Sequence, residues 1–179
     1  MKKPFWLALL TLIVYINPSV ANESTTSTKV IVLSAIKDFP VTNAGHAPYY
    51  VDKRTKALGI NAGNEDYRNV FARAVTTFQG GSGEYDITIR LITEEDGEPL
   101  YRLLINNEVV RTYRASYIGK SSAKDLAAED HTWQQITLKK GDEIAIESAT
   151  HTNGEVPENG GTAWARGRWQ QLTFTLKTR

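Results

Sequence analysis

The sequence predicts an all-β fold, a sandwich or barrel in a single domain. Several short stretches alternate apolar and polar residues with the two-residue period of a strand, and turn-forming residues separate them. Only one short segment, residues 121–129, is even weakly helical in pattern. The chain has 179 residues, of which 41% are hydrophobic and 23% charged, so it has the length and composition of one globular domain.

The N-terminal residues have the pattern of an export signal. Lys2 and Lys3 precede an almost wholly apolar run over residues 5–16, and Ser19-Val20-Ala21 matches a small-x-small cleavage site. The apolar run is too short for a membrane anchor, because a spanning helix needs about 20 residues. We therefore expect a signal peptide over residues 1–21, bacterial in style, and a secreted or periplasmic product without membrane insertion.

The mature chain is expected to be a short tail followed by one domain. Residues 22–29 are small and polar, as in a flexible tail, and residues 30–179 contain all the strand patterns. The whole chain has a formal charge of +1, which provides no broad electrostatic surface for nucleic acid.

The first strands are predicted from β-branched content and alternation. Residues 30–33 are a β-branched run, and residues 71–78 alternate loosely. Residues 85–91 alternate cleanly, which places one set of side chains on a single face: Tyr85, Ile87, Ile89 and Leu91.

The later strands are predicted to form two hairpins and a closing strand. Residues 100–110 should fold back at Asn106-Asn107, because Asn tolerates the left-handed conformation of a tight turn. Residues 133–147 should fold back at Lys139–Asp142, and residues 172–176 alternate as a closing strand.

Several kinds of chemistry are excluded by what the sequence lacks. The chain has no cysteine, which rules out disulfides, a thiolate zinc site and a cysteine nucleophile. It contains no G-x-S-x-G or H-E-x-x-H motif, and Gly80–Gly83 precedes a strand without the Lys of a phosphate loop. The three histidines, His46, His131 and His151, show no metal-ligand spacing.

Three local patterns occur in an order that resembles a known family. They are Gly83–Arg90 (GEYDITIR), Tyr101–Asn107 (YRLLINN) and the stretch Trp133–Ile146, which contains W-x-x-I and K-G-D. In this order they resemble the jelly-roll carbohydrate-binding modules of the galactose-binding-like type, over roughly residues 47–177. The resemblance implies an antiparallel β-sandwich that binds a glycan through loops at one end.

The resemblance also implies a structural calcium, between an acidic residue of the opening strand and an Asp before the closing strand. Here Tyr50-Val51-Asp52-Lys53 replaces the usual Tyr-x-Ala-Glu, and the neutral Gln171 precedes Leu172. Because calcium favours several carboxylate oxygens, this departure weakens the expectation of a calcium site.

The long loop over residues 149–169 is the first candidate binding loop. A sugar ring offers an apolar face and a rim of hydroxyls, so an aromatic platform with an Arg fork could bind a hydroxylated or anionic sugar. The candidates in this loop are His151, Asn153, Trp164, Arg166, Arg168 and Trp169. In the alternative interpretation Trp169 caps the core and the arginines pair with nearby Glu residues. Trp133 is expected in the core.

The second candidate loop is residues 93–99, TEEDGEP, where Glu94, Asp96 and Glu98 are candidate ligands, together with Tyr101 just beyond the loop. These carboxylates could bond sugar hydroxyls, hold a cation, or pair with Arg166 and Arg168. The alternative is a solvated tip that turns at Asp96-Gly97. If both loops lie at the same end of the sandwich, their acidic and basic groups would meet there.

Three functions therefore remain open. The first is an exported, non-catalytic carbohydrate-binding domain, and the second is a secreted protein-interaction or adhesion domain on the same fold. The third is a small polysaccharide-acting enzyme, for which a base and a cation could come from Tyr101, His151, Arg166 and Arg168.

Overall fold

The computed structural model describes residues 29–178. The predicted signal peptide and almost all of the predicted tail lie outside these residues. The strands are β1 (Val30–Ser34), β2 (Tyr49–Asp52), β3 (Ala57–Ile60), β4 (Phe71–Thr77), β5 (Gly83–Ile92), β6 (Leu100–Ile105), β7 (Glu108–Arg114), β8 (Ala128–Leu138), β9 (Glu143–Ala149), β10 (Pro157–Glu158), β11 (Gly161–Thr162) and β12 (Trp169–Leu176). The helical segments are α1 (Ala35–Asp38) and the 3₁₀ turn η1 (Glu65–Tyr67).

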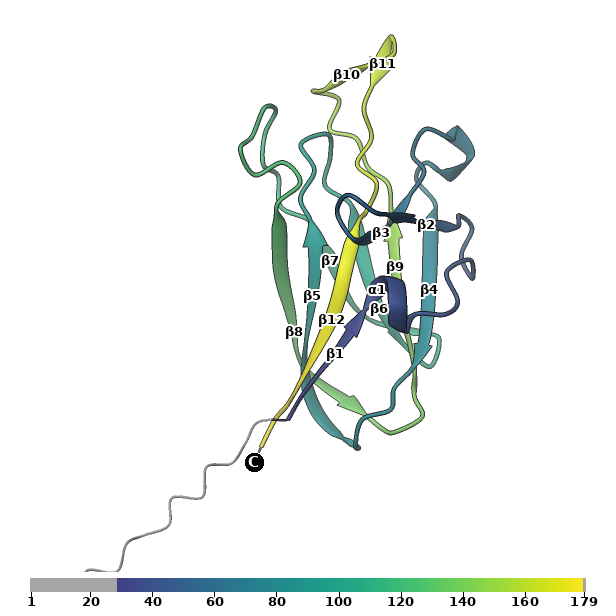
Figure 1. The fold of residues 1–179 in the computed structure, drawn as a ribbon, viewed down its shortest axis with the longest axis vertical. Helices are drawn as coiled ribbons and strands as arrows, with labels where there is room; N and C mark the ends of the chain where they lie inside the picture. The colour runs from purple at the N-terminus through teal and green to yellow at the C-terminus, as the bar shows by residue number, and fades with distance from the viewer. Residues whose placement is uncertain (1–28, 179) are drawn as a thin grey trace, which may run out of the picture.

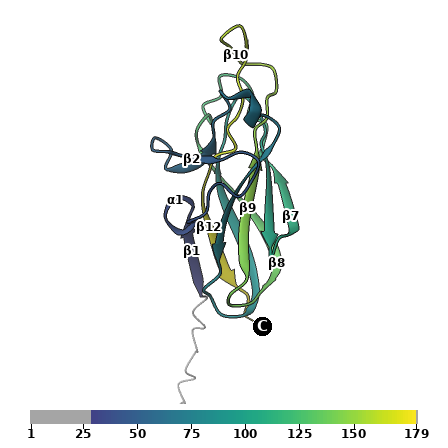
Figure 2. The same ribbon diagram turned by 90° about the vertical axis from the view of Figure 1, so that its right-hand side faces the viewer.

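Two antiparallel sheets pack face to face, as the sequence predicts (Figures 1 and 2). One sheet has the order β2-β3-β12-β5-β8, with β1 also paired to β12, and the other has the order β4-β9-β6-β7. The chain crosses between the sheets repeatedly, so strands distant in sequence become neighbours. The first described residues and the C-terminus lie at one end, and the β10–β11 hairpin projects from the other (Figure 1).

The core lies between the sheets and is built by strand alternation. Ile87, Ile89 and Leu91 of β5 are fully buried and belong to the same cluster as Ile144 and Ile146 of β9. Burying an aliphatic side chain of this kind contributes about 1.5–3 kcal/mol. The alternating patterns of the sequence therefore identified the inward face of the central strands correctly.

Both predicted turns are present. The first, at Asn106-Asn107, forms for the reason predicted from the sequence. Asn106 and Asn107 have φ of 50° and 71°, the left-handed conformation that a two-residue β-hairpin turn requires. In the turn between β8 and β9, Gly141 has φ of 94° and Asp142 Oδ2 accepts a hydrogen bond from Lys139 N at 2.7 Å.

The one weak helix candidate, residues 121–129, does not form a helix. This segment forms turns, and β8 begins at Ala128. Leu126 N donates to Thr93 O at 2.8 Å and Thr93 N donates to Ala127 O at 2.9 Å, so bonds to the end of β5 replace helical bonds. Strand β2 overlaps the Tyr50–Lys53 segment that the resemblance places at the opening strand, whereas the short strands β3, β10 and β11 were not predicted. No helix within residues 29–178 is long and apolar enough to cross a membrane.

Candidate functional site

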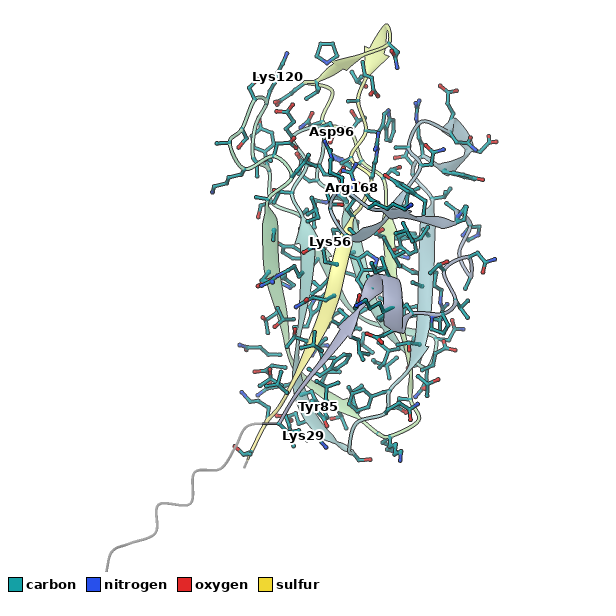
Figure 3. All side chains as sticks on the ribbon, in the orientation of Figure 1. Lys29, Lys56, Tyr85, Asp96, Lys120 and Arg168 are labelled. Atoms are coloured by element: carbon teal, nitrogen blue, oxygen red, sulfur yellow. The ribbon has the colours of Figure 1, made fainter. Side chains whose placement is uncertain are left out.

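The two candidate loops meet at the end of the sandwich from which β10 and β11 project (Figures 1 and 3). Asn153 N donates to Asp96 O at 3.0 Å, and its side-chain Nδ2 donates to Glu95 O at 2.9 Å. Glu98 N donates to His151 Nδ1 at 3.0 Å. Asn153, Glu98 and His151 therefore join the two loops.

Gly97 allows the closest approach between these loops. A Cβ atom at this position would lie 2.3 Å from His151 O, a distance that no side chain tolerates. The absence of a side chain at residue 97 is therefore a steric requirement of the loop contact.

A buried ion cluster holds the base of the two loops in place. Arg168 lies between Asp52 at the end of β2 and Glu94 after β5: Arg168 Nε is 2.8 Å from Asp52 Oδ2, and Arg168 Nη1 donates to Glu94 Oε2. Glu94 also accepts hydrogen bonds from the backbone N–H of Arg166, at 2.9 and 3.0 Å. Only 4% of Arg168 and 4% of Glu94 is exposed, so this pairing takes place out of water.

Burial dominates the titration of Glu94. It raises the pKa of Glu94 to about 7, and the charge of Arg168 and the N–H of Arg166 limit that rise. Glu94 and Arg168 are therefore parts of the framework beneath the site, as the alternative interpretation of pairing with Glu anticipated.

A hollow of about 160 Å³ opens above this cluster. Its polar lining consists of four carboxylates and three guanidinium groups: Glu94, Glu95, Asp96, Asp125, Arg54, Arg166 and Arg168. Two of the carboxylates bond the backbone across neighbouring loops, since Glu95 Oε2 accepts from Ser121 N and Asp125 Oδ1 accepts from Glu95 N at 3.1 Å.

The remaining groups at this hollow are available to a ligand. Partial burial raises the pKa of Asp96, and its carboxylate forms no side-chain ion pair within residues 29–178. Arg166 is exposed, and its Nη1 donates to Tyr50 Oη at 3.3 Å. Arg54 is exposed as well. The hollow therefore presents a carboxylate acceptor beside guanidinium donors, which is a suitable arrangement for hydroxyl groups.

Two predicted ligand residues, Trp169 and Tyr101, are buried instead. Trp169 begins β12 and is fully buried, with its ring edge-on to Phe39 at a centroid distance of 4.9 Å. Tyr101 on β6 is fully buried, and its O–H donates to Arg168 O at 2.9 Å. Both fall on inward positions of their strands, so neither can contact a ligand. Trp133 is in the core, as expected.

Trp164 is half-buried and does not line the hollow. The guanidinium carbon of Arg68 lies 5.2 Å from the centre of its ring, so a cation–π contact covers part of the predicted platform.

Three residues that sequence reasoning did not select lie at this end of the molecule. Arg54 and Asp125 line the hollow, and Tyr117 has 60% of its surface exposed. The Tyr117 O–H donates to Glu155 Oε1 at 2.8 Å, which holds the ring beside the 149–169 loop. An aromatic residue within the polar segment 115–127 was the only sequence signal for this position.

The calcium arrangement implied by the family resemblance does not fit these residues. Asp52 pairs with Arg168, and the Gln171 side chain, a neutral amide, donates to Thr173 Oγ1 at 3.3 Å, so both groups already have partners within the protein. A guanidinium group already neutralises the carboxylates at this point, and no cluster of three metal-ligating side chains occurs within the described chain.

The chain is 31% identical to Uncharacterized protein P23 of Formosa agariphila over 117 residues, which is 65% of this chain and 25% of that protein, so it spans about a quarter of that relative's length. No protein-family model matches the chain.

Similar solved structures are carbohydrate-binding modules. CsCBM6-3 of Clostridium stercorarium, solved with cellobiose, matches with a TM-score of 0.52 and 10% identity over 82% of this chain and 94% of that module. The family 35 module of Cellvibrio japonicus Abf62 matches with a TM-score of 0.51 and 14% identity, over 84% and 95% of the two chains. The C-terminal family 6 module of the laminarinase LamC of Zobellia galactanivorans matches with a TM-score of 0.50 and 12% identity, over 82% and 99%. The chain therefore has the jelly-roll fold of these carbohydrate-binding modules.

Proposed function

We propose that this protein is an exported, non-catalytic domain that binds a glycan in the hollow at the loop end. The observation that supports the proposal best is the hollow itself, where the partly buried Asp96 carboxylate and the exposed Arg166 guanidinium line one opening above a buried ion cluster. A carboxylate that accepts and a guanidinium that donates can together bond neighbouring hydroxyls of one sugar. The fold of the similar solved modules is consistent with this use of the loops.

Tyr117 would supply the apolar part of the recognition. Its ring is the most exposed aromatic surface within residues 29–178, and the bond to Glu155 limits its movement. An aromatic face stacks on the C–H face of a pyranose, while polar groups bond the rim. In this proposal Tyr117 takes the role that the sequence assigned to Trp164.

The arrangement does not favour the polysaccharide-acting enzyme. Of the four residues that the sequence offered for catalysis, Tyr101 and Arg168 are buried, and His151 accepts a hydrogen bond from Glu98 N. A base and a cation therefore do not converge from these positions on a shared opening.

Export forms part of the proposal and rests on residues 1–21. Expression of the full chain in a bacterial host should give a periplasmic or secreted product that begins at Asn22. Intact-mass measurement would check this, and a product that retains Met1–Ala21 would contradict it.

A binding screen tests the glycan proposal. The purified protein is titrated against a panel of neutral and acidic polysaccharides by affinity electrophoresis and calorimetry. A hydrogen bond to a charged group contributes about 1.5–3 kcal/mol, so Asp96→Asn should weaken binding roughly ten- to a hundredfold. The matched control is Glu108→Gln, an exposed carboxylate-to-amide change in the strand that follows the distant Asn106-Asn107 turn, and it should have no effect.

Aromatic variants separate stacking from hydrogen bonding. Tyr117→Ala should weaken binding and Tyr117→Phe should retain most of it, while Trp164→Ala should leave the affinity of the folded protein unchanged. Absence of binding across the panel would overturn the proposal in favour of a protein-interaction domain. Binding that is indifferent to both Asp96→Asn and Tyr117→Ala would place the site elsewhere.

A further inference from the structure

A second hollow adjoins the loop-end hollow on the side of the six-stranded sheet. Its volume is about 420 Å³, and it shares Arg54 and Leu126 with the loop-end hollow. Its other walls include Lys56 from the β2–β3 turn and Gln170 from β12. In Figure 3, Asp96, Arg168 and Lys56 follow one another from the loop end down towards the sheet.

The charge of this second hollow differs from that of the first. Two cations, Arg54 and Lys56, line it, and no carboxylate does. Neither cation forms an ion pair within residues 29–178. The remaining wall is largely apolar, with Ile92, Leu126 and Ala128. A cationic rim over an apolar wall favours an anionic group carried on a ring with apolar C–H surface.

The turn that carries the two cations is held in place by Asp52. Its Oδ1 accepts hydrogen bonds from Arg54 N at 2.9 Å and Thr55 N at 3.3 Å, while its Oδ2 pairs with Arg168. Lys56 has φ of 53°, so the chain turns sharply at this residue. Gln170 Nε2 donates to Thr55 O at 2.6 Å and ties the turn to β12.

This arrangement leaves Arg54 and Lys56 without an ion-pair partner within residues 29–178. Asp52 is the nearest carboxylate in sequence, but its charge is shared with the buried Arg168 guanidinium. The turn is therefore held by Asp52, a residue whose charge is already paired with the guanidinium of Arg168. The backbone from which both cations project is therefore already fixed, so only their side chains need to be ordered when an anion binds.

We propose that this second hollow binds an acidic group of a polysaccharide whose neighbouring sugar occupies the loop-end hollow. The inference rests on the proposed function and names the class of ligand, an anionic polysaccharide. Arg54 lines both hollows and would contact both sugars. The acidic group is a uronate carboxylate or a sulfate ester, since both oxyanions suit a guanidinium and an ammonium.

Two matched pairs of polymers test the proposal and distinguish the two sources of charge. Polygalacturonate is compared with its methyl ester, and dextran sulfate with dextran, by affinity electrophoresis and calorimetry at several salt concentrations. The acidic member of at least one pair should bind at least tenfold more tightly than its neutral counterpart. The pair that shows this difference identifies the carboxylate or the sulfate ester.

Charge-removing variants locate the effect. Lys56→Gln and Arg54→Gln should each weaken binding of the acidic polymer about fivefold or more and make it less dependent on salt. Lys140→Gln, an exposed lysine in the distant β8–β9 turn, is the control and should change nothing. If Lys56→Gln and Lys140→Gln weakened binding of the acidic polymer equally, the polymer would be attracted to positive charge anywhere on the surface, and the inference would be overturned.

The outcomes separate this inference from the proposed function. Equal binding of acidic and neutral polymers that is lost in Asp96→Asn would overturn the inference and leave the proposed function in place. Acidic binding that is lost in Arg166→Gln but kept in Lys56→Gln and Arg54→Gln would put the anion in the loop-end hollow, and would also overturn it. Absence of binding to every polymer would overturn both.

Discussion

Replacing Arg168 by methionine should destabilise the protein severely at neutral pH. The guanidinium is 4% exposed and lies between Asp52 and Glu94, so its removal would leave two carboxylates without their shared cation. One ion pair at 4 Å contributes about 4 kcal/mol of attraction at an effective dielectric constant of 20. Dehydration of the guanidinium offsets part of this, and breaking a buried pair by removing one partner costs about 3–5 kcal/mol. Methionine keeps much of the aliphatic packing, so the decrease in the free energy of unfolding would measure the effect of removing the charge.

Arg166→Met is the matched control for this prediction. Arg166 is only two residues away but exposed, and its side chain forms one hydrogen bond, to Tyr50 Oη at 3.3 Å. We expect it to cost less than about 1 kcal/mol, as is usual for surface positions. The free energy of unfolding would be measured by urea denaturation of the purified protein and both variants.

The pH dependence gives a second check on the same reasoning. In the Arg168→Met variant the carboxylates of Asp52 and Glu94 can take up protons as the pH falls. The decrease in the free energy of unfolding should therefore be largest at pH 8 and smaller at pH 5. A loss at pH 8 no greater than that of Arg166→Met would refute the role assigned to the ion cluster. A loss that does not change with pH would show that packing, and not charge, is the cause.

Three further predictions concern stability. Because folding raises the pKa of Glu94 from an ordinary 4.5 to about 7, its stabilising contribution is complete below pH 4.5 and is lost as the pH rises to 7. Glu94→Gln should lack this decline in a denaturation series over that range, and a parallel decline in the variant would disprove the assignment. Gly97→Ala should cost at least about 2 kcal/mol, because its Cβ would clash with His151 O. The control Gly81→Ala should be tolerated, because a Cβ there would have no atom within 4 Å. Equal melting temperatures of the two variants would contradict this. Asn107→Val should cost about 1–2 kcal/mol more than Asn107→Gly, because a φ of 71° disfavours β-branched residues, while both variants lose the hydrogen bond from Arg73 Nη1 to Asn107 Oδ1. The opposite order would count against the left-handed turn.

The central strands and the hairpins could be predicted because their signals are local. The alternation of Tyr85, Ile87 and Ile89 follows from the two-residue period of a strand that is buried on one face. The Asn106-Asn107 turn follows from the conformational tolerance of asparagine itself. Neither inference needs a distant residue. The segment 121–129 shows the limit, because hydrogen bonds to Thr93 outweigh its weak helical pattern.

The candidate site was predicted at the level of loops and only in part at the level of side chains, since Glu94, Asp96, Arg166 and Arg168 line the hollow but Trp169 and Tyr101 are buried. Residues 93–99 and 149–169 do meet, but Trp169 is buried whereas Trp164 is half-exposed, and Arg168 is buried whereas Arg166 is exposed. These pairs are alike in composition and nearly adjacent in sequence. What separates them is the point at which β12 begins, since the inward positions of that strand and of the segment leading into it face the core.

The sequence by itself determined the fold class, the positions of the central strands along the chain and the segments that supply the loops, because each of these depends on spacing along the chain. Only the tertiary structure decided which charges meet. Arg168 pairs with Asp52 and Glu94 across 116 and 74 positions of sequence, and Arg54 enters the site from a turn without any motif. Ion pairing depends on distance in space and on exclusion of water, and neither quantity is encoded in local pattern.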